Sequence, residues 1–163
     1  MKSALSQALK LEFHRRMKSV MPSFEKAGTD FGGVIYRQWD RDSERYVFVF
    51  LSPSQKFDRF TIELAVNSKA EFPFSLLPGD RSPDGAARER IRKFVFGVND
   101  GWWNLNRSHE PDMMAILESQ EQSYTATSAI PGLVEDSVRR VVEAVPVFLK
   151  SLKSAQQKSQ DRA

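Results

Sequence analysis

The sequence predicts an α+β fold, in which an antiparallel sheet of about four to six strands packs against an N-terminal helix and C-terminal helices. Two observations carry this prediction. Apolar residues recur every three or four positions near both ends of the chain, as they do on amphipathic helices, whereas between 34 and 66 they alternate with a period of two, as in strands. We expect a single domain over 1–153 and a polar, frayed tail over 154–163.

The first helix is predicted from about Ser3 to Val20, where one apolar stripe comprises Leu5, Leu9, Phe13, Met17 and Val20. A second stripe predicts a last helix, interrupted at Pro146, and comprises Val134, Val138, Val141, Val145, Phe148 and Leu152. Pro111 favours the first turn of a short helix that ends near Gln122. After the first helix, three glycines are expected to turn the chain towards the first strand: Gly28, Gly32 and Gly33.

The segments 34–40 and 45–52, joined by a charged turn, predict a β-hairpin. The second of these strands is apolar on both parities, so we expect it to be central in the sheet. The segment 60–66 alternates more regularly, so that one face meets the core and the other is more polar. The following segment, 67–85, contains three prolines and two glycines and therefore predicts a long loop.

A further strand is expected over 88–96, followed by a hairpin turn at Asp100 and Gly101, because both central residues of a type I′ turn need positive φ. In this hairpin Asn99 pairs with Trp102. Trp103 then joins the core face, whereas Trp102 lies on a mostly polar face where it is available for contact. The alternative is that both tryptophans are buried.

Several motifs along the chain, namely FEKAGTDFGGVIYRQWD, RFTIELAV, DGWWNL and VPVFL, follow the N-terminal helix in this order. With a basic strand before DGWWNL, this arrangement resembles the bacterial domain-of-unknown-function family numbered 4304 over nearly the whole chain. FLSPSQK and ELAV depart from the family's pattern, which has a shorter polar motif and Asn-Leu-Gly there. Because the family has no settled biochemical role, the resemblance implies a fold and no site residues.

The composition argues against several classes of function. With no cysteine there is no thiolate nucleophile, zinc ribbon or iron–sulfur cluster, and a reducing compartment is favoured. Charges interrupt the apolar runs, so neither a signal peptide nor a membrane span is expected. The net charge of +3 does not favour a dedicated nucleic-acid binder. We therefore expect a cytoplasmic protein with no membrane partner.

The sequence contains no catalytic motif, and we predict no catalytic residue, metal or cofactor. Its two histidines, His14 and His109, have neither triad nor metal-ligand spacing around them. The cluster of His109, Glu110 and Asp112 nevertheless leaves a small metal-dependent enzyme as the last of three hypotheses. A helix start rich in acidic residues is the simpler explanation of this cluster.

The first hypothesis is a non-enzymatic, immunity-like or accessory domain that binds another protein. Its candidate anchors are aromatic residues near predicted edges and loops: Trp39, Phe72, Phe74 and Trp102. The second hypothesis is nucleic-acid or phosphate binding through Arg88, Arg90 and Arg92, which share one parity of the predicted basic strand. Cross-strand pairing of these arginines with Glu63 or Glu71 is the alternative.

Overall fold

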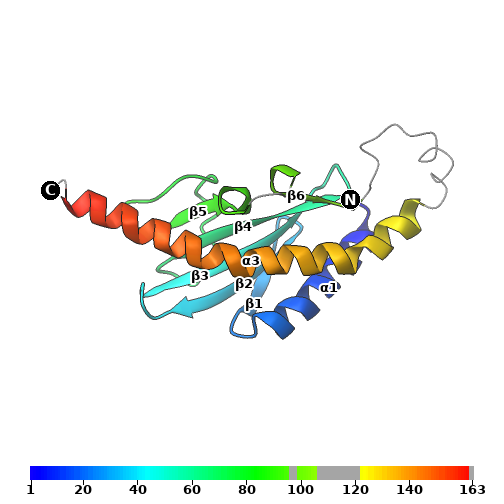
Figure 1. Ribbon diagram of the computed structural model, residues 1–163, viewed down its shortest axis with the longest axis horizontal. Coiled ribbons are helices and arrows are strands. Elements are labelled where there is room, and N and C mark those ends of the chain that lie inside the picture. The colour runs from blue at the N-terminus through cyan, green and yellow to red at the C-terminus, as the bar shows by residue number, and fades with distance from the viewer. Residues whose placement is uncertain (96–98, 106–121, 162–163) are drawn as a thin grey trace.

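The computed structural model describes residues 1–95, 99–105 and 122–161, and it contains a sheet and a layer of helices (Figure 1). The helices are α1 (Ser3–Val20) and α3 (Gln122–Asp161), and the strands are β1 (Glu25–Asp30), β2 (Gly33–Asp40), β3 (Arg45–Pro53), β4 (Arg59–Asn67), β5 (Ala87–Arg90) and β6 (Trp102–Asn104). Among the described residues, six strands form one open antiparallel sheet in the order β1-β2-β3-β4-β5, with β6 also paired to β4. The predicted α+β fold is confirmed.

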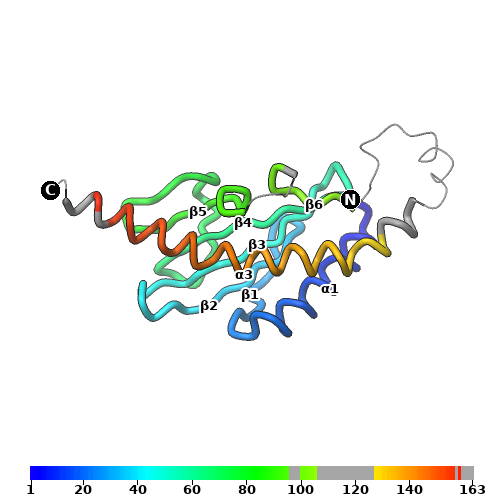
Figure 2. The backbone as a smooth tube through the Cα atoms, in the orientation of Figure 1, coloured from blue at the N-terminus to red at the C-terminus, as the bar shows by residue number. Residues whose placement is uncertain are grey.

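Both helices pack on the same apolar core as one face of the sheet, and α3 runs along the long axis of the molecule (Figure 2). Helix α1 has the predicted bounds and buries Leu9, Phe13 and Met17. The predicted stripe of α3 faces the core, where its buried apolar residues are Ile130, Val134, Val138, Val141, Ala144, Val145 and Phe148. The periodicity of the sequence therefore identified the correct face of each helix.

Strand β3 is central, as its sequence predicts. It pairs with β2 on one side and β4 on the other, and its residues from Val47 to Leu51 are all buried. Alternate side chains contribute to two separate apolar clusters: Val47, Val49 and Leu51 face the helices, whereas Phe48 and Phe50 face the opposite side. A strand buried on both faces must be apolar on both parities, and this one is.

Strand β1 was not predicted, because its sequence EKAGTD has no apolar alternation. It lies at the edge of the sheet, its side chains are exposed or half-buried, and a register shift interrupts its pairing with β2 between Lys26 and Gly28. The chain reverses at Phe31 and Gly32, which both have positive φ, of 48° and 74°. The turn predicted from helix to strand is therefore wrong: Gly32 lies in a hairpin turn between two strands, while Gly28 is inside β1 and Gly33 begins β2.

The second face of the sheet is more buried than the sequence indicates. On β4, Glu63 and Ala65 are buried opposite the main core. They are covered because the segment 68–86, which contains nearly all of the loop predicted over 67–85, folds back over this face and places Phe72 against Phe48 and Phe50. The loop therefore completes a second, smaller apolar layer.

The strand predicted over 88–96 is wrong beyond Arg90, where β5 ends and a 3-10 helix spans Ile91–Lys93. The predicted turn has positive φ at Asp100 and Gly101, of 52° and 82°. Residues 96–98, the predicted partner strand, lie outside the described residues. Strand β6 pairs with β4, so that Trp103 stands opposite Phe60.

Helix α3 is longer than its sequence pattern predicts. It runs for 40 residues, passes through Pro131 and Pro146 and continues to Asp161, beyond the position where we expected a tail. Each proline removes one helical hydrogen bond. Around Pro146, the buried side chains of Val145 and Phe148 fix both flanking turns on the core, so the helix continues. The short helix predicted from Pro111 lies outside the described residues.

Trp103 joins β6 to α3. Its side chain is 3% exposed, stacks on Phe60 with ring centroids 5.5 Å apart, and donates its Nε1 hydrogen to Asp136 Oδ2 over 2.9 Å. Partial burial acts to raise the pKa of Asp136, but the hydrogen bonds from Trp103 and Arg139 outweigh it and lower the pKa. The core role predicted for Trp103 is confirmed.

We expect Trp103→Phe to lower the free energy of unfolding by about 2 kcal/mol, because a hydrogen bond to a charged group is lost. Urea denaturation measures this loss. Because the folded-state pKa of Asp136 is lowered, the bond stabilises the protein at neutral pH and is lost as the pH falls through that pKa. The difference in free energy of unfolding between the wild type and Trp103→Phe should therefore become smaller at acidic pH. A loss of similar size in Trp102→Phe would contradict this role for Trp103.

Two glycine substitutions should have opposite effects on stability. A Cβ at Gly33 would collide with the carbonyl oxygen of Leu51 and the ring of Phe50, so Gly33→Ala should lower the free energy of unfolding by about 1–3 kcal/mol. A Cβ at Gly132, inside α3, would meet nothing within 4 Å. Gly132→Ala should therefore raise the free energy of unfolding by as much as about 1 kcal/mol, because alanine has the higher helix propensity. Thermal and urea unfolding measure both changes, and destabilisation by Gly132→Ala would contradict the helix described at this position.

Candidate binding surface

The strand register brings several predicted site residues to one face of the sheet, opposite the helices, which we call the outer face. Across neighbouring strands, directly paired residues share a face. Trp39 pairs with Tyr46, Arg88 with Ala65, Arg90 with Glu63 and Trp102 with Thr61. The predicted residues Trp39, Arg88, Arg90 and Trp102 therefore all belong to the outer face.

Phe72 and Phe74 form the inner layer of this face. Phe72 is only 7% exposed, and its ring centroid lies 5.2 Å from that of Phe50 and 4.6 Å from that of Phe74. Phe74 also packs edge-on against Phe31, which is 66% exposed. The two predicted anchors thus hold the segment 68–86 on the sheet, and Phe31 is the ring of this group that faces solvent.

Arg88 is an internal residue. Its Nη2 lies 2.9 Å from Glu63 Oε2, and the two side chains are 14% and 8% exposed. Its Nη1 donates to the carbonyl oxygen of Leu76 over 2.7 Å, and its guanidinium lies over the rings of Phe72 and Phe74. The alternative prediction of an ion pair with Glu63 is confirmed for Arg88.

The three predicted arginines do not form a row. Arg92 lies on the 3-10 helix after β5, where its Nη1 is 3.1 Å from Asp100 Oδ1. Arg90 is exposed on the outer face, and its side chain has no hydrogen bond or ion pair with another described residue. Of the three, Arg90 alone therefore has an uncompensated charge within the described part of the chain.

A stack of three side chains, Phe57, Arg59 and Trp102, forms the centre of the candidate surface, and we call it the Arg59 cluster. The Arg59 guanidinium carbon lies 4.2 Å from the Trp102 ring centroid and 4.9 Å from that of Phe57. Phe57 is 51% exposed and Trp102 is half-buried. Nε of Arg59 is buried and has no hydrogen-bond partner among the described residues.

Sequence reasoning identified Trp102 but missed Phe57 and Arg59. Arg59 stands beside Trp102 only because β6 pairs with β4, with Arg59 opposite Asn104. This pairing joins residues about 45 positions apart, and no local pattern encodes it. The alternation of β6 gives the one available clue, because a buried Trp103 places Trp102 on the outer face.

Trp39 lies near the other end of the outer face. It is 46% exposed and packs edge-on against Tyr46, with ring centroids 4.9 Å apart. Arg37 lies over the same tyrosine and also pairs with Glu25 through a 2.8 Å contact. Of the four predicted aromatic anchors, Trp39 and Trp102 thus lie in two separate groups on the outer face, whereas Phe72 and Phe74 belong to the apolar layer between these groups.

The hypothesis of a metal-dependent enzyme concerns His109, Glu110 and Asp112, which lie outside the described residues. Elsewhere in the described chain, no group of three His, Cys, Asp or Glu residues is placed to hold a metal ion. His14 shares a 3.1 Å hydrogen bond with the buried hydroxyl of Tyr36, whose pKa burial raises strongly. Over the described ranges, none of the helices has the length and apolar composition required to cross a membrane.

The Glu63–Arg88 pair should be essential to the second apolar layer. Removing one partner of a buried pair leaves an uncompensated charge, so Glu63→Gln should lower the free energy of unfolding by about 3 kcal/mol. Hydrogen exchange should accelerate over 68–86. The matched control is Glu25→Gln, which breaks the more exposed pair with Arg37 and should cost less than about 1 kcal/mol. Equal losses in the two variants would show that the Glu63–Arg88 pair has no special role.

No family model, curated protein or solved structure matches this chain. The resemblance to the domain-of-unknown-function family numbered 4304 stays a prediction from the sequence motifs.

Proposed function

We propose that this protein is a non-enzymatic binding domain that recognises an acidic segment of another protein through the Arg59 cluster. The observation that carries the proposal is the placement of the Arg59 guanidinium between Phe57 and Trp102, with no ion pair to another described residue. A stacked guanidinium is held in position by the two rings. Its N–H edge can then donate to a carboxylate in a fixed geometry.

The surroundings of the Arg59 cluster favour an acidic and partly apolar partner. Lys56 lies 5.6 Å from the ring centroid of Phe57. Arg90 stands opposite Glu63, two residues along β4 from the Thr61–Trp102 pair, a step of about 7 Å along the strand. Exposed ring surface beside cations that have no ion pair within the described ranges suits a carboxylate next to an apolar side chain, and Trp and Arg are frequent interface anchors.

Nucleic-acid binding ranks below protein binding. The nucleic-acid hypothesis was based on a predicted row of three arginines. Of these, Arg88 is buried against Glu63, and Arg92 pairs with Asp100. The stacked rings of the Arg59 cluster suit bases as well as side chains, so single-stranded RNA belongs among the test ligands. A cytoplasmic location is part of the same proposal and is supported by the lack of cysteine.

The test uses a displayed library of random dodecapeptides, selected on the whole protein, followed by fluorescence anisotropy with the enriched peptides. We expect enrichment of Asp or Glu beside an apolar residue. Trp102→Ala and Arg59→Gln should each weaken binding by about tenfold or more, since interface anchors contribute about 2 kcal/mol. The charge-matched control is Arg41→Gln, at the exposed β2–β3 turn, which should leave binding unchanged.

Two outcomes would overturn the proposal. In the first, no enriched peptide depends on Arg59 or Trp102. In the second, single-stranded RNA binds with the same dependence on these residues and with a steep loss on adding salt, while acidic peptides do not bind; this outcome would support the nucleic-acid hypothesis.

A further inference from the structure

A groove runs between helix α1 and the end strands of the sheet, β1 and β2, and we call it the α1 groove. It consists of two hollows of about 290 and 250 Å³, which share the lining residues His14, Lys26 and Tyr36. Lys26 pairs with Tyr36 across β1 and β2, so both side chains lie on the helix side of the sheet. The α1 groove is therefore separate from the outer face, where the Arg59 cluster lies.

One wall of the α1 groove has a row of basic side chains. Lys10, His14 and Lys18 follow one another at intervals of four residues on α1, so they share one face of the helix and are about 6 Å apart along its axis. Lys26 of β1 lines the opposite wall. The three lysine side chains have no hydrogen bond or ion pair with any residue that the structure describes. Glu25, the one carboxylate among the lining residues, already pairs with an arginine of β2, so the groove has an excess of positive charge.

His14 is held in position at the middle of this row. Its Nδ1 lies 3.1 Å from the hydroxyl oxygen of Tyr36, and the two rings stack. Burial raises the pKa of Tyr36 strongly, so the hydroxyl keeps its hydrogen. A hydroxyl can donate to a neutral imidazole and accept from a charged one, so this hydrogen bond persists in both charge states of His14. The second ring nitrogen, Nε2, has no partner among the described residues.

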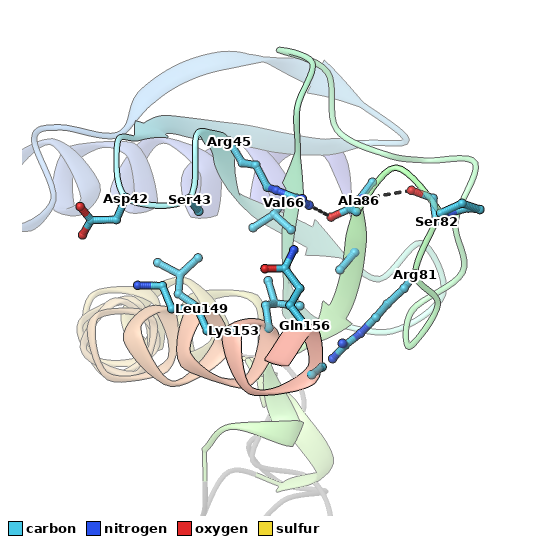
Figure 3. Close-up of a pocket in the computed structure, with 15 residues that line it drawn as sticks. Asp42, Ser43, Arg45, Val66, Arg81, Ser82, Ala86, Leu149, Lys153 and Gln156 are labelled. Atoms are coloured by element: carbon cyan, nitrogen blue, oxygen red, sulfur yellow. Dashed lines mark hydrogen bonds between the residues drawn. The ribbon is translucent and has the colours of Figure 1, made fainter. Parts of the chain in front are cut away.

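The regular spacing distinguishes the α1 groove from a cleft of about 420 Å³ between α3 and the end of β4 and β5 (Figure 3). In that cleft Lys153 lies on the same side as Asp42, and Arg81 lies on the opposite side. Arg45 donates to the carbonyl oxygen of Gly85. The cations of the cleft therefore form no row, whereas helix geometry sets the row of the α1 groove.

We propose that the α1 groove binds an extended acidic segment of a partner protein, with carboxylates on alternate residues facing Lys10, His14 and Lys18. Alternate side chains of an extended chain lie about 7 Å apart on one side, which is close to the spacing of the row. Leu11, which also lines the groove and is 75% exposed, adds apolar surface for the partner. The inference does not depend on the function proposed for the Arg59 cluster.

A peptide suits the α1 groove better than a single-stranded nucleic acid does. Proteins bind such strands through exposed aromatic rings on which the bases stack. The rings of Phe24 and Tyr36 line the groove, but these residues are only 6% and 1% exposed. Among the lining residues, the imidazole of His14 is therefore the one ring that is open to a base.

The experiment is an NMR titration of the full chain with two capped peptides of equal composition, Glu-Ala-Glu-Ala-Glu and Ala-Glu-Glu-Glu-Ala. Only the first peptide can place three carboxylates on one side of an extended chain. We expect it to bind about threefold more tightly than the second, with amide shifts centred on α1 and β1. A hexanucleotide of deoxythymidine tests the nucleic-acid alternative, and we expect it to bind more weakly than the first peptide.

The pH dependence tests the role of His14. Histidine gains its charge between about pH 8 and pH 5, so the first peptide should bind more tightly as the pH falls over this range. The other titratable groups that line the groove with His14 are those of Lys10, Lys18, Glu25, Lys26 and Tyr36. His14→Gln should remove the pH dependence and retain binding at high pH.

Charge variants separate this site from general attraction between opposite charges. Lys10→Gln and Lys18→Gln should each weaken binding of the first peptide by about threefold. The matched control, Lys150→Gln, removes the same charge from α3, outside both hollows, and should leave binding unchanged. Arg59→Gln should also leave it unchanged, which distinguishes this site from the Arg59 cluster.

Four outcomes would overturn the proposal. They are equal binding of the two peptides, amide shifts that avoid α1 and β1, equal weakening in Lys10→Gln and Lys150→Gln, and tighter binding of the hexanucleotide than of the first peptide.

Discussion

The burial of β3 on both faces is the constraint on which the rest of the structure depends. Its valines and Leu51 require the helices on one side, and its two phenylalanines require a second cover on the other. No helix in the described chain lies on that second side, so the segment 68–86 must supply the cover. A segment without regular structure can do this because Arg88, paired with Glu63, donates a hydrogen bond to the carbonyl oxygen of Leu76 and lies against both phenylalanine rings of the segment.

The adjacent tryptophans follow from the alternation of a strand. Trp103 is fixed in the core by Phe60 and by Asp136 of α3, so its neighbour must point to the outer face. There Trp102 meets Arg59, which belongs to the same strand as Phe60. A contact between β6 and a helix on one side of the sheet therefore determines the position of the candidate binding residue on the other side.

The sequence predicts those parts of the fold whose pattern is local. Both helix stripes, the β2–β3 hairpin and the central place of β3 follow from apolar periodicity. Strand β1 could not be predicted from apolar periodicity, because an exposed edge strand needs no apolar residue. Strand β5 is shorter than predicted because a 3-10 helix begins at Ile91. The contact of Arg59 with Trp102 depends on the pairing of β6 with β4, two segments far apart in the chain, which composition and spacing do not encode.

The two edges of the sheet have a consequence for self-association. An unpaired strand edge is a template on which another copy of the chain can extend the sheet. Here the first edge, β1, has the charged residues Glu25, Lys26 and Asp30 and a break in register near Gly28. Along its second edge, β4 is covered by two short strands of four and three residues, β5 and β6, instead of one long flat one. Neither border offers a long, regular run of backbone donors and acceptors, so the sheet is poorly suited to polymerise through its strands.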